Sequence, residues 1–119
     1  MLSLTILGKR APGWTREEFQ RYWREDHAPL IARVTNFSRH VRSYTQYHTL
    51  ASPQLEAMFG GARDYDGVAV LTFDDEAAMK AAFSEPDYIE FIRPDELHFV
   101  DVDNCMVIVG EINPVIESA

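Results

Sequence analysis

The chain has 119 residues, 46% of them hydrophobic and 25% charged, which is enough for one domain with a buried core but too few for two. Its net charge of −8 and its scattered basic residues argue against a nucleic-acid partner, because such binding relies on clustered lysine and arginine. We expect neither a membrane span nor a signal peptide. The single cysteine, Cys105, excludes an internal disulfide. Together these features predict one cytoplasmic domain over residues 1–119.

The first half of the chain predicts a strand, a long helix and a second strand. Leu2–Gly8 is the first strand. Thr15 and Glu18 have the spacing of a capping box, which begins an amphipathic helix. The inner stripe of that helix consists of Phe19, Tyr22, Trp23, Leu30 and Val34. Val41–His48 is the second strand, and the link over residues 49–66 is long enough to be functional, mobile or to contain a short helix.

The second half repeats this order. Gly67–Phe73 is predicted to be a strand, and Asp74 or Asp75 caps the helix that follows. That helix has Met79, Ala82 and Phe83 on its inner stripe, and a second helical turn starts at Ser84–Pro86. Phe99–Glu111 is the predicted last strand. Strand, helix, strand, strand, helix, strand is the order of an α+β, ferredoxin-like fold with a four-stranded antiparallel sheet.

The strands are apolar on both faces. In Gly67–Phe73, Val68 and Val70 lie on one face, and Ala69, Leu71 and Phe73 lie on the other. Two helices cover only one face of such a sheet, so the second face needs a cover. We favour a homodimer whose two sheets pack face to face. The alternative is that the long link covers part of the face.

His27 is the first candidate for chemistry. It lies four residues after Trp23 and three before Leu30, so it faces inward with the helix stripe. Pro29 lacks a backbone N–H, and we expect the helix to bend there and leave polar backbone groups unpaired. An imidazole at such a bend can be oriented by one hydrogen bond while its other nitrogen faces a cavity. Alternatively, His27 is a satisfied structural histidine.

A polar row on the second strand is the other candidate. Arg42, Tyr44, Gln46 and His48 share one face of a strand that we expect to be central or nearly so. A buried polar row is either a satisfied hydrogen-bond network or the wall of a pocket. If the row faces the helix, His27 and Tyr44 converge on one small ligand. If it faces a dimer partner, it is interface polarity.

Other groups in the sequence are weaker candidates for a functional site. Asp101 and Asp103 share a strand face, but the sequence supplies no third oxygen ligand for a cation. No glycine-rich loop follows a strand and opens a helix, so no nucleotide site is indicated. Cys105 has no neighbouring base and is predicted to be an inert buried thiol. We therefore predict no metal and no cofactor.

Several motifs resemble the EthD family of the dimeric α+β barrel superfamily. They are KRAPGWTREEFQRYWREDHAPL, RSYTQYH, DYDGVAVLTFDDEAAMKAAFSEPDY and DELHFVD, which together span nearly the whole chain. The resemblance implies a ferredoxin-like monomer that dimerises through its sheets. It also implies a pocket between helix and sheet, with the family histidine at His27 and the alternating strand residues at Tyr44, Gln46 and His48. The cysteine of some lactone isomerases has no counterpart at the matching loop.

Members of that family are similar to cofactor-free enzymes that isomerise, decarboxylate, dehydrate or cyclise aromatic, polyketide-like or lactone substrates. We therefore predict His27 as general acid or base, with Tyr44 and His48 as hydrogen-bond donors to a developing oxyanion. The predicted substrate-binding residues are Tyr22, Trp23, Gln46, Phe83 and Asp101. The alternatives are a non-catalytic accessory protein that binds a hydrophobic metabolite, and a haem-binding protein.

Overall fold

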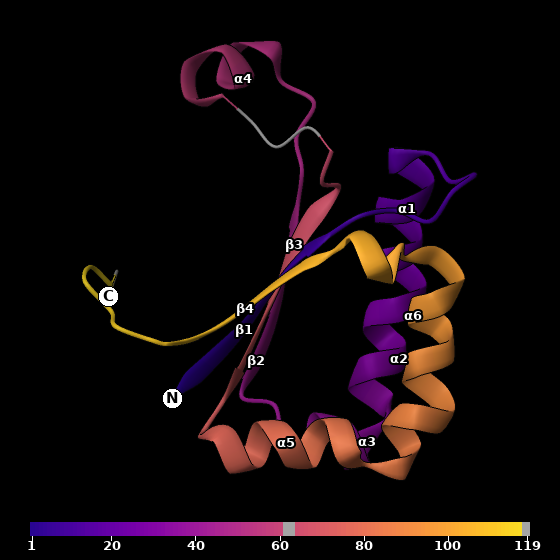
Figure 1. The fold of residues 1–119 in the computed structure, drawn as a ribbon, viewed down its shortest axis with the longest axis vertical. Coiled ribbons are helices and arrows are strands. Elements are labelled where there is room, and N and C mark those ends of the chain that lie inside the picture. The colour runs from indigo at the N-terminus through magenta and orange to yellow at the C-terminus, as the bar shows by residue number, and fades with distance from the viewer. Residues whose placement is uncertain (61–63, 118–119) are drawn as a thin grey trace.

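The fold is one antiparallel sheet with helices on one face, as the computed structural model shows for residues 1–60 and 64–117 (Figure 1). The strands are β1 (Leu2–Gly8), β2 (Ser43–His48), β3 (Gly67–Phe73) and β4 (Met106–Glu111), in the order β2-β3-β1-β4. The helical segments are α1 (Arg16–Tyr22), a π-helical turn (Trp23–His27), α2 (Ala28–Arg33), α3 (Thr35–Ser38), α4 (Pro53–Phe59), α5 (Glu76–Ser84), a second π-helical turn (Tyr88–Ile92), α6 (Arg93–Phe99) and a 3-10 turn (Val102–Asn104). The predicted ferredoxin-like α+β fold is confirmed.

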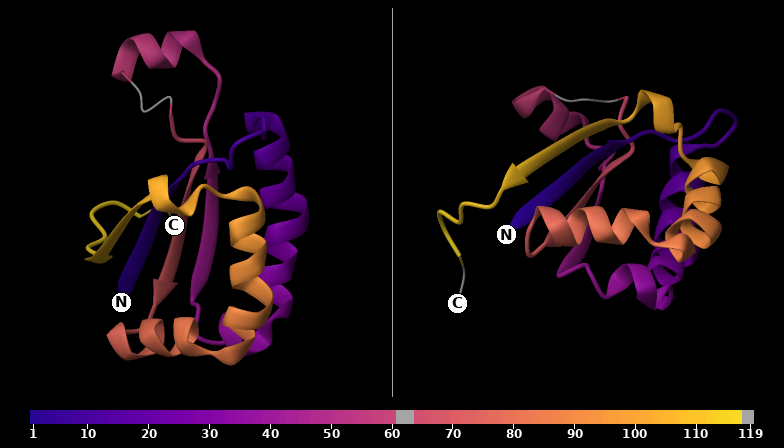
Figure 2. Two further views of the ribbon diagram at one scale, coloured as in Figure 1. Left: turned by 45° about the vertical axis from the view of Figure 1, so that its right-hand side comes forward. Right: turned by 60° about the horizontal axis from the view of Figure 1, so that its bottom comes forward.

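The core lies between the sheet and these helices. Along β3, buried and half-buried residues alternate, with the buried ones on the helix side. Phe37, Phe73, Ile92 and Phe99 are almost fully enclosed there. Figure 2 shows α1, α2 and α6 side by side against this face, with α5 crossing its lower end. The helices thus cover one face only.

Local capping follows the sequence. Thr15 accepts a hydrogen bond from the Glu18 backbone N–H while Glu18 accepts one from the Thr15 N–H, which confirms the capping box. Asp75, rather than Asp74, caps α5 by accepting from the Ala78 N–H. Asp74 instead binds the guanidinium of Arg42 at the surface.

The link over residues 49–66 contains α4. Ser52 caps this helix through the Leu55 N–H, and Gly60 follows it with a φ of 72°. Figure 1 shows α4 standing apart from the main body, beyond the ends of β2 and β3. None of its residues is buried. The short helix was one of the open alternatives, and residues 61–63 lie outside the described part.

Two predictions about the sheet were wrong. Strand β2 is an edge strand of the described sheet, paired with β3, whereas we expected it to be central or nearly so. The last strand starts at Met106 rather than Phe99, because Phe99 is the buried final residue of α6 and Val102–Asn104 forms a 3-10 turn. In this region Val100 makes only an isolated bridge to Arg10. The alternation of Val100 and Val102 with aspartates is typical of a strand, but α6 continues through Phe99.

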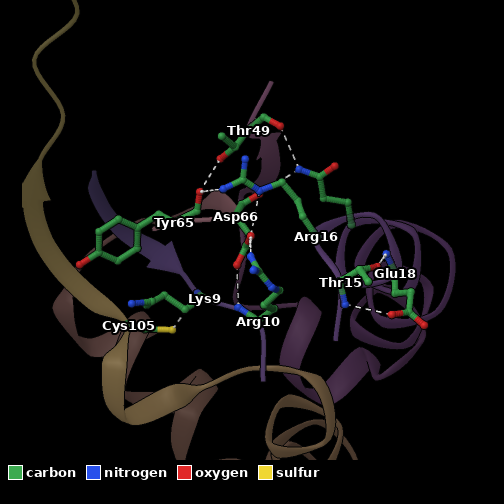
Figure 3. A network of polar contacts seen from close by, with 10 residues as sticks. Lys9, Arg10, Thr15, Arg16, Glu18, Thr49, Tyr65, Asp66 and Cys105 are labelled. Atoms are coloured by element: carbon green, nitrogen blue, oxygen red, sulfur yellow. Dashed lines mark hydrogen bonds and ion pairs between the residues drawn. The ribbon is translucent and has the colours of Figure 1, made fainter. Parts of the chain in front are cut away.

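A buried carboxylate ties the segment after β1 to the start of β3. Asp66 has 0% of its surface exposed and accepts hydrogen bonds from the Arg10 backbone N–H at 2.8 Å, the Arg10 guanidinium at 2.6 Å and Arg16 Nε at 2.9 Å (Figure 3). Burial disfavours its ionised form, but the bonds from Arg16 and Arg10 outweigh this and lower the pKa of Asp66. This network positions α1 against the sheet.

Candidate functional site

A cavity of about 260 Å³ lies between the helices and the sheet. Most of its wall is apolar, and it includes Leu4, Phe19, Ile31, Leu71, Phe83 and Phe99. Polar side chains also line it, among them His27, Tyr44, Tyr88, Arg93 and Glu96. An apolar pocket with a few convergent polar groups is the usual form of a small-ligand site.

The irregular helix around His27 is a π-helical turn, which replaces the bend expected at Pro29. Because proline cannot donate to the carbonyl four residues earlier, a regular α-helix is disfavoured here. The chain widens instead, and the Ala28 N–H donates to the Trp23 carbonyl five residues back. Gln46 Nε2 donates to the same carbonyl at 3.0 Å. This turn directs His27 toward the sheet.

His27 is buried, with 5% of its surface exposed. Its Nδ1 lies 2.7 Å from Asp95 Oδ2. A carboxylate only accepts hydrogen bonds, so Nδ1 carries a proton, and in the neutral imidazole Nε2 is the nitrogen with the lone pair. Within residues 1–60 and 64–117, no hydrogen bond to Nε2 is found. The imidazole thus lies in the cavity wall with its orientation fixed through Nδ1.

Asp95 lies at the start of α6 and contacts two side chains, Tyr22 of α1 and His27 of the first π-helical turn. Its second oxygen accepts a hydrogen bond from the hydroxyl of Tyr22. Burial and this bond raise the pKa of Tyr22 to about 12. The chain Tyr22–Asp95–His27 therefore holds the imidazole in one orientation and one tautomer.

Tyr44 projects from β2 into the cavity. Its hydroxyl oxygen accepts hydrogen bonds from Trp23 Nε1 at 3.1 Å and Gln46 Nε2 at 3.0 Å. Both acceptor positions of the oxygen are then occupied, so its own proton is available to a ligand. Burial raises the pKa of Tyr44, which keeps the hydroxyl protonated. Tyr44 is therefore a preorganised hydrogen-bond donor.

His48 lies behind Tyr44 and does not line the cavity. Its Nε2 is 2.9 Å from Gln46 Oε1, and its ring packs on Trp23 with centroids 4.6 Å apart. Burial, followed by the nearby Arg24, lowers the pKa of His48. Neutral His48 therefore orients the Gln46 amide, which in turn orients Tyr44.

Glu96 and its neighbours form the last polar group. Tyr88 donates a hydrogen bond to Glu96 Oε1 at 2.6 Å, and Arg93 Nη1 lies 3.7 Å from the same oxygen. Burial raises the pKa of Glu96, although the Tyr88 bond, His27 and Arg93 act in the opposite direction. The cavity wall thus contains both the imidazole of His27 and the carboxyl group of Glu96.

Residues 11–103 match the family model described as the EthD domain. The chain belongs to the EthD family. The matched range contains His27, Tyr44, Tyr88, Arg93 and Glu96 of the cavity wall, and the helix of Asp95.

Three related proteins cover most of this EthD chain. Dehydratase ustZ of Ustilaginoidea virens is 26% identical over 98% of this chain and 86% of its own length. The conidial pigment biosynthesis dehydratase EthD of Metarhizium robertsii is 27% identical over 99% and 87%. Decarboxylase nsrE of Aspergillus novofumigatus is 25% identical over 93% and 77%.

Solved structures agree on the fold. An EthD family protein from Bacillus halodurans has a TM-score of 0.66 at 17% identity, covering 95% of this chain and 100% of its own. A protein from Bacteroides fragilis, described as dimeric, of unknown function and of ferredoxin-like fold, has a TM-score of 0.64 at 12% identity, covering 93% and 95%.

The structure places the predicted site residues of this EthD domain in three positions. Trp23, His27, Tyr44 and Phe83 line the cavity. Tyr22, Gln46 and His48 lie around it and hold its polar groups. Asp101 does not line it, and its carboxylate accepts a hydrogen bond from Asn104. The polar row from Tyr44 to His48 faces the helices, whereas Arg42 is exposed.

Sequence reasoning missed Asp95, Glu96, Tyr88 and Arg93 as site residues. The available signal was Pro94, which permits a helix start and puts Asp95 and Glu96 in the first turn of that helix.

Cys105 also lines the cavity and is half-buried. Burial raises the pKa of its thiol, which disfavours the reactive thiolate. Among the described residues, no group of three or more His, Cys, Asp or Glu side chains could hold a metal ion.

Proposed function

We propose that this EthD protein is a small enzyme of the dehydratase or decarboxylase kind, which transfers protons within the cavity to and from an aromatic or polyketide-like substrate. The supporting observation is the His27–Asp95 pair, which leaves a basic ring nitrogen in an apolar cavity that Tyr44 also lines. The names of the related dehydratases and decarboxylase point to the same class of reaction.

His27 acts first as the general base. Its Nε2 takes a proton from a carbon next to a substrate carbonyl, and the electron pair of the C–H bond becomes that of an enolate. Asp95 stabilises the imidazolium that forms and keeps the ring in place, because its carboxylate accepts from Nδ1 at 2.7 Å. Isomerisation and aldol-type cyclisation begin with the same step.

Tyr44 stabilises the charge that develops. Its hydroxyl donates to the carbonyl oxygen as that oxygen becomes an enolate or phenolate oxygen. The bonds from Trp23 and Gln46 fix the hydroxyl before the substrate arrives, so little reorganisation is needed. Tyr44 is thus the oxyanion donor, and His48 is a positioning residue.

The protein acts as a homodimer in this proposal. Tyr47, Val68, Val70, Met106 and Ile108 lie on the sheet face opposite the helices, as the strand register requires. We name these residues the outer face. Ile108 is 60% exposed and Met106 is 54% exposed, which is unusual for a sheet surface in water. Solved structures of ferredoxin-like proteins that are described as dimeric support the same assembly.

Within residues 1–60 and 64–117, no helix is long and apolar enough to span a membrane.

Proton exchange on a probe ketone tests the proposed function. The probe is the aldol adduct of acetone and benzaldehyde, whose methylene protons next to the carbonyl are followed by NMR in heavy water. The wild-type protein should accelerate their exchange above the buffer rate. His27→Gln keeps a donor for Asp95 but has no base, so the exchange rate should fall about 100-fold or more.

His40→Ala is the matched control. His40 pairs with Glu85 away from the cavity, so its removal should leave the exchange rate unchanged. Circular dichroism should show both variants folded. A wild-type protein that does no better than buffer contradicts the proposal and leaves a metabolite-binding protein. A Soret band after haem addition favours the haem alternative.

A further inference from the structure

Glu96 is a cavity residue that this mechanism does not use. It lies one position after Asp95 on α6, so the two carboxyl groups belong to the same helical turn but contact different partners. Asp95 binds Tyr22 and His27, and Glu96 binds Tyr88 and approaches Arg93. Only Asp95 therefore serves the imidazole directly.

The contacts of Glu96 leave one oxygen available. Tyr88 donates to Oε1 at 2.6 Å, and the nearest Arg93 nitrogen is 3.7 Å from Oε1, beyond hydrogen-bond distance. No hydrogen bond to Oε2 is found in the part of the chain that the structure describes. The Glu96 side chain is 23% exposed, and a single neutral donor and a distant guanidinium compensate this half-buried carboxylate only in part.

Burial therefore favours the acid form of Glu96. It raises the pKa of this carboxyl more than the Tyr88 bond, His27 and Arg93 lower it. Glu96 also contributes to the raised pKa of Tyr44, although burial is the main cause there. An imidazole and a carboxyl group with a raised pKa, together in one cavity wall, are the two kinds of group that elimination of water needs.

We propose that Glu96 is the second proton-transfer group of the site and that the substrate is a β-hydroxy carbonyl compound from which the protein removes water. The proposal deepens the proposed function and rests on it. His27 forms the enolate, and Glu96 donates its proton from Oε2 to the hydroxyl on the next carbon.

The step balances without any further reactant. His27 removes the proton next to the carbonyl, the electron pair of that C–H bond becomes the new C=C bond, and the C–O bond breaks. The departing oxygen takes the Glu96 proton and leaves as water. The protein is left with an imidazolium and a carboxylate, and one proton passing from His27 to Glu96 restores the starting state.

The aldol adduct of acetone and benzaldehyde also reports this second step. Its methylene exchange needs only His27, whereas its dehydration to benzylideneacetone, followed by ultraviolet absorbance, also needs an acid. In Glu96→Gln, the ratio of the dehydration rate to the exchange rate should fall about 100-fold. Glu96→Asp keeps a carboxyl group and should recover part of that ratio.

Glu90→Gln is the control with the same loss of charge. Glu90 lies on the second π-helical turn but is exposed and outside the cavity, so its ratio should equal that of the wild type. A second measurement needs no substrate. The Glu96 carboxyl carbon, assigned by comparison with Glu96→Gln, should titrate above an ordinary glutamate in carbon NMR.

Three results would overturn the inference. In the first, Glu96→Gln dehydrates the probe as fast as the wild type. In the second, exchange and dehydration fall equally, which means that Glu96 supports the fold or His27. In the third, Glu96 titrates at or below the ordinary glutamate pKa. None of these alters the effect of His27→Gln on exchange, so failure of this inference is distinguishable from failure of the proposed function.

Discussion

Asp66 illustrates how one buried side chain can hold distant segments of the fold together. Asp66 is the last residue of the link over residues 49–66, and its enclosed carboxylate accepts bonds from Arg10 and Arg16. Three charge-assisted hydrogen bonds meet on it, and they join the segment after β1 to the start of β3. No local pattern reveals this, because the partners are about half the chain away in sequence.

We predict that Asp66→Asn destabilises the protein by about 2 kcal/mol, since a neutral amide leaves both guanidinium groups less well compensated. The pKa of Asp66 is lowered in the folded state. Its stabilising effect is therefore present above the unfolded pKa and is lost as the pH falls through the folded pKa. Urea denaturation of both proteins from neutral to acidic pH measures the difference, which should shrink on acidification.

Asp64→Asn is the control for that series. Asp64 is exposed two residues away, so its substitution should change the free energy of unfolding by less than about 0.5 kcal/mol. An Asp66→Asn protein as stable as Asp64→Asn would show that the network contributes nothing.

His48 and Tyr44 show the limit of assigning roles by residue type. Both belong to one alternating row, and both were predicted to donate to an oxyanion. The structure puts only Tyr44 in the cavity wall, whereas His48 reaches it through Gln46. The Trp23 ring, which lines the cavity, packs on His48 with centroids 4.6 Å apart, and His48 itself does not line the cavity.

At the scale of elements, two helices share the same construction. Each π-helical turn is followed by a short α-helix with proline near its start, Pro29 in α2 and Pro94 in α6. His27 ends the first turn, and Asp95 and Glu96 follow the second. Insertion of one extra residue per turn often occurs at functional sites. Here it accompanies the side chains that meet in the cavity.

The contact between the first π-helical turn and β3 depends on a glycine. A Cβ on Gly67 would lie 2.5 Å from the Trp23 ring and 2.8 Å from the Tyr47 carbonyl oxygen. We predict that Gly67→Ala displaces Trp23, weakens its hydrogen bond to Tyr44, and costs about 2 kcal/mol of stability. Near-ultraviolet circular dichroism should show a changed tryptophan signal, because Trp23 moves. The unfolding midpoint should fall as well.

Gly110→Ala is the matched control on β4. No atom would lie within 4 Å of a Cβ at that position, so alanine should be accommodated there. If Gly67→Ala melts at the same temperature as Gly110→Ala, then Trp23 does not require the glycine.

At the scale of the molecule, the sheet has one covered and one open face. Figures 1 and 2 show all the packed helices on the same side, and β4 extends away from them. On the open face of β4, Met106 and Ile108 are more than half exposed, and Val107 and Val109 on the helix side of this strand are exposed to a similar extent. An apolar surface of this kind is costly in water and is typical of an interface between copies.

We predict that the wild-type protein is a dimer at micromolar concentration and that Ile108→Lys makes it monomeric, because the lysine would be buried unpaired between two outer faces. The substitution makes the net charge less negative, so electrostatic repulsion between the two subunits cannot explain a loss of the dimer. Light scattering measures the mass. A monomeric wild-type protein contradicts the face-to-face assembly.

Val109→Lys provides the comparison. Val109 is 55% exposed, close to the 60% of Ile108, but it lies on the other face of β4. Its substitution should leave the dimer intact. Equal dissociation of both variants would place the interface at the β4 edge instead of the outer face.

The local chemistry of this chain is readable from its sequence. Alternating residues determined β1 and β3, the Thr15–Glu18 spacing determined where α1 starts, and the helix stripe put His27 inward. These features depend on residues within about one helical turn or one strand of each other, so periodicity and capping rules reach them. The apolar outer face follows from the same alternation.

Only the tertiary structure decided what His27 meets. Its partner Asp95 is 68 positions away, and the pair forms because two prolines widen separate helices that pack together. The same packing raises the pKa of Glu96 and turns the Tyr44 hydroxyl toward the cavity, since burial and hydrogen bonding depend on neighbours distant in sequence. Sequence pattern therefore determined the elements and their buried faces, and packing determined which polar groups share the site.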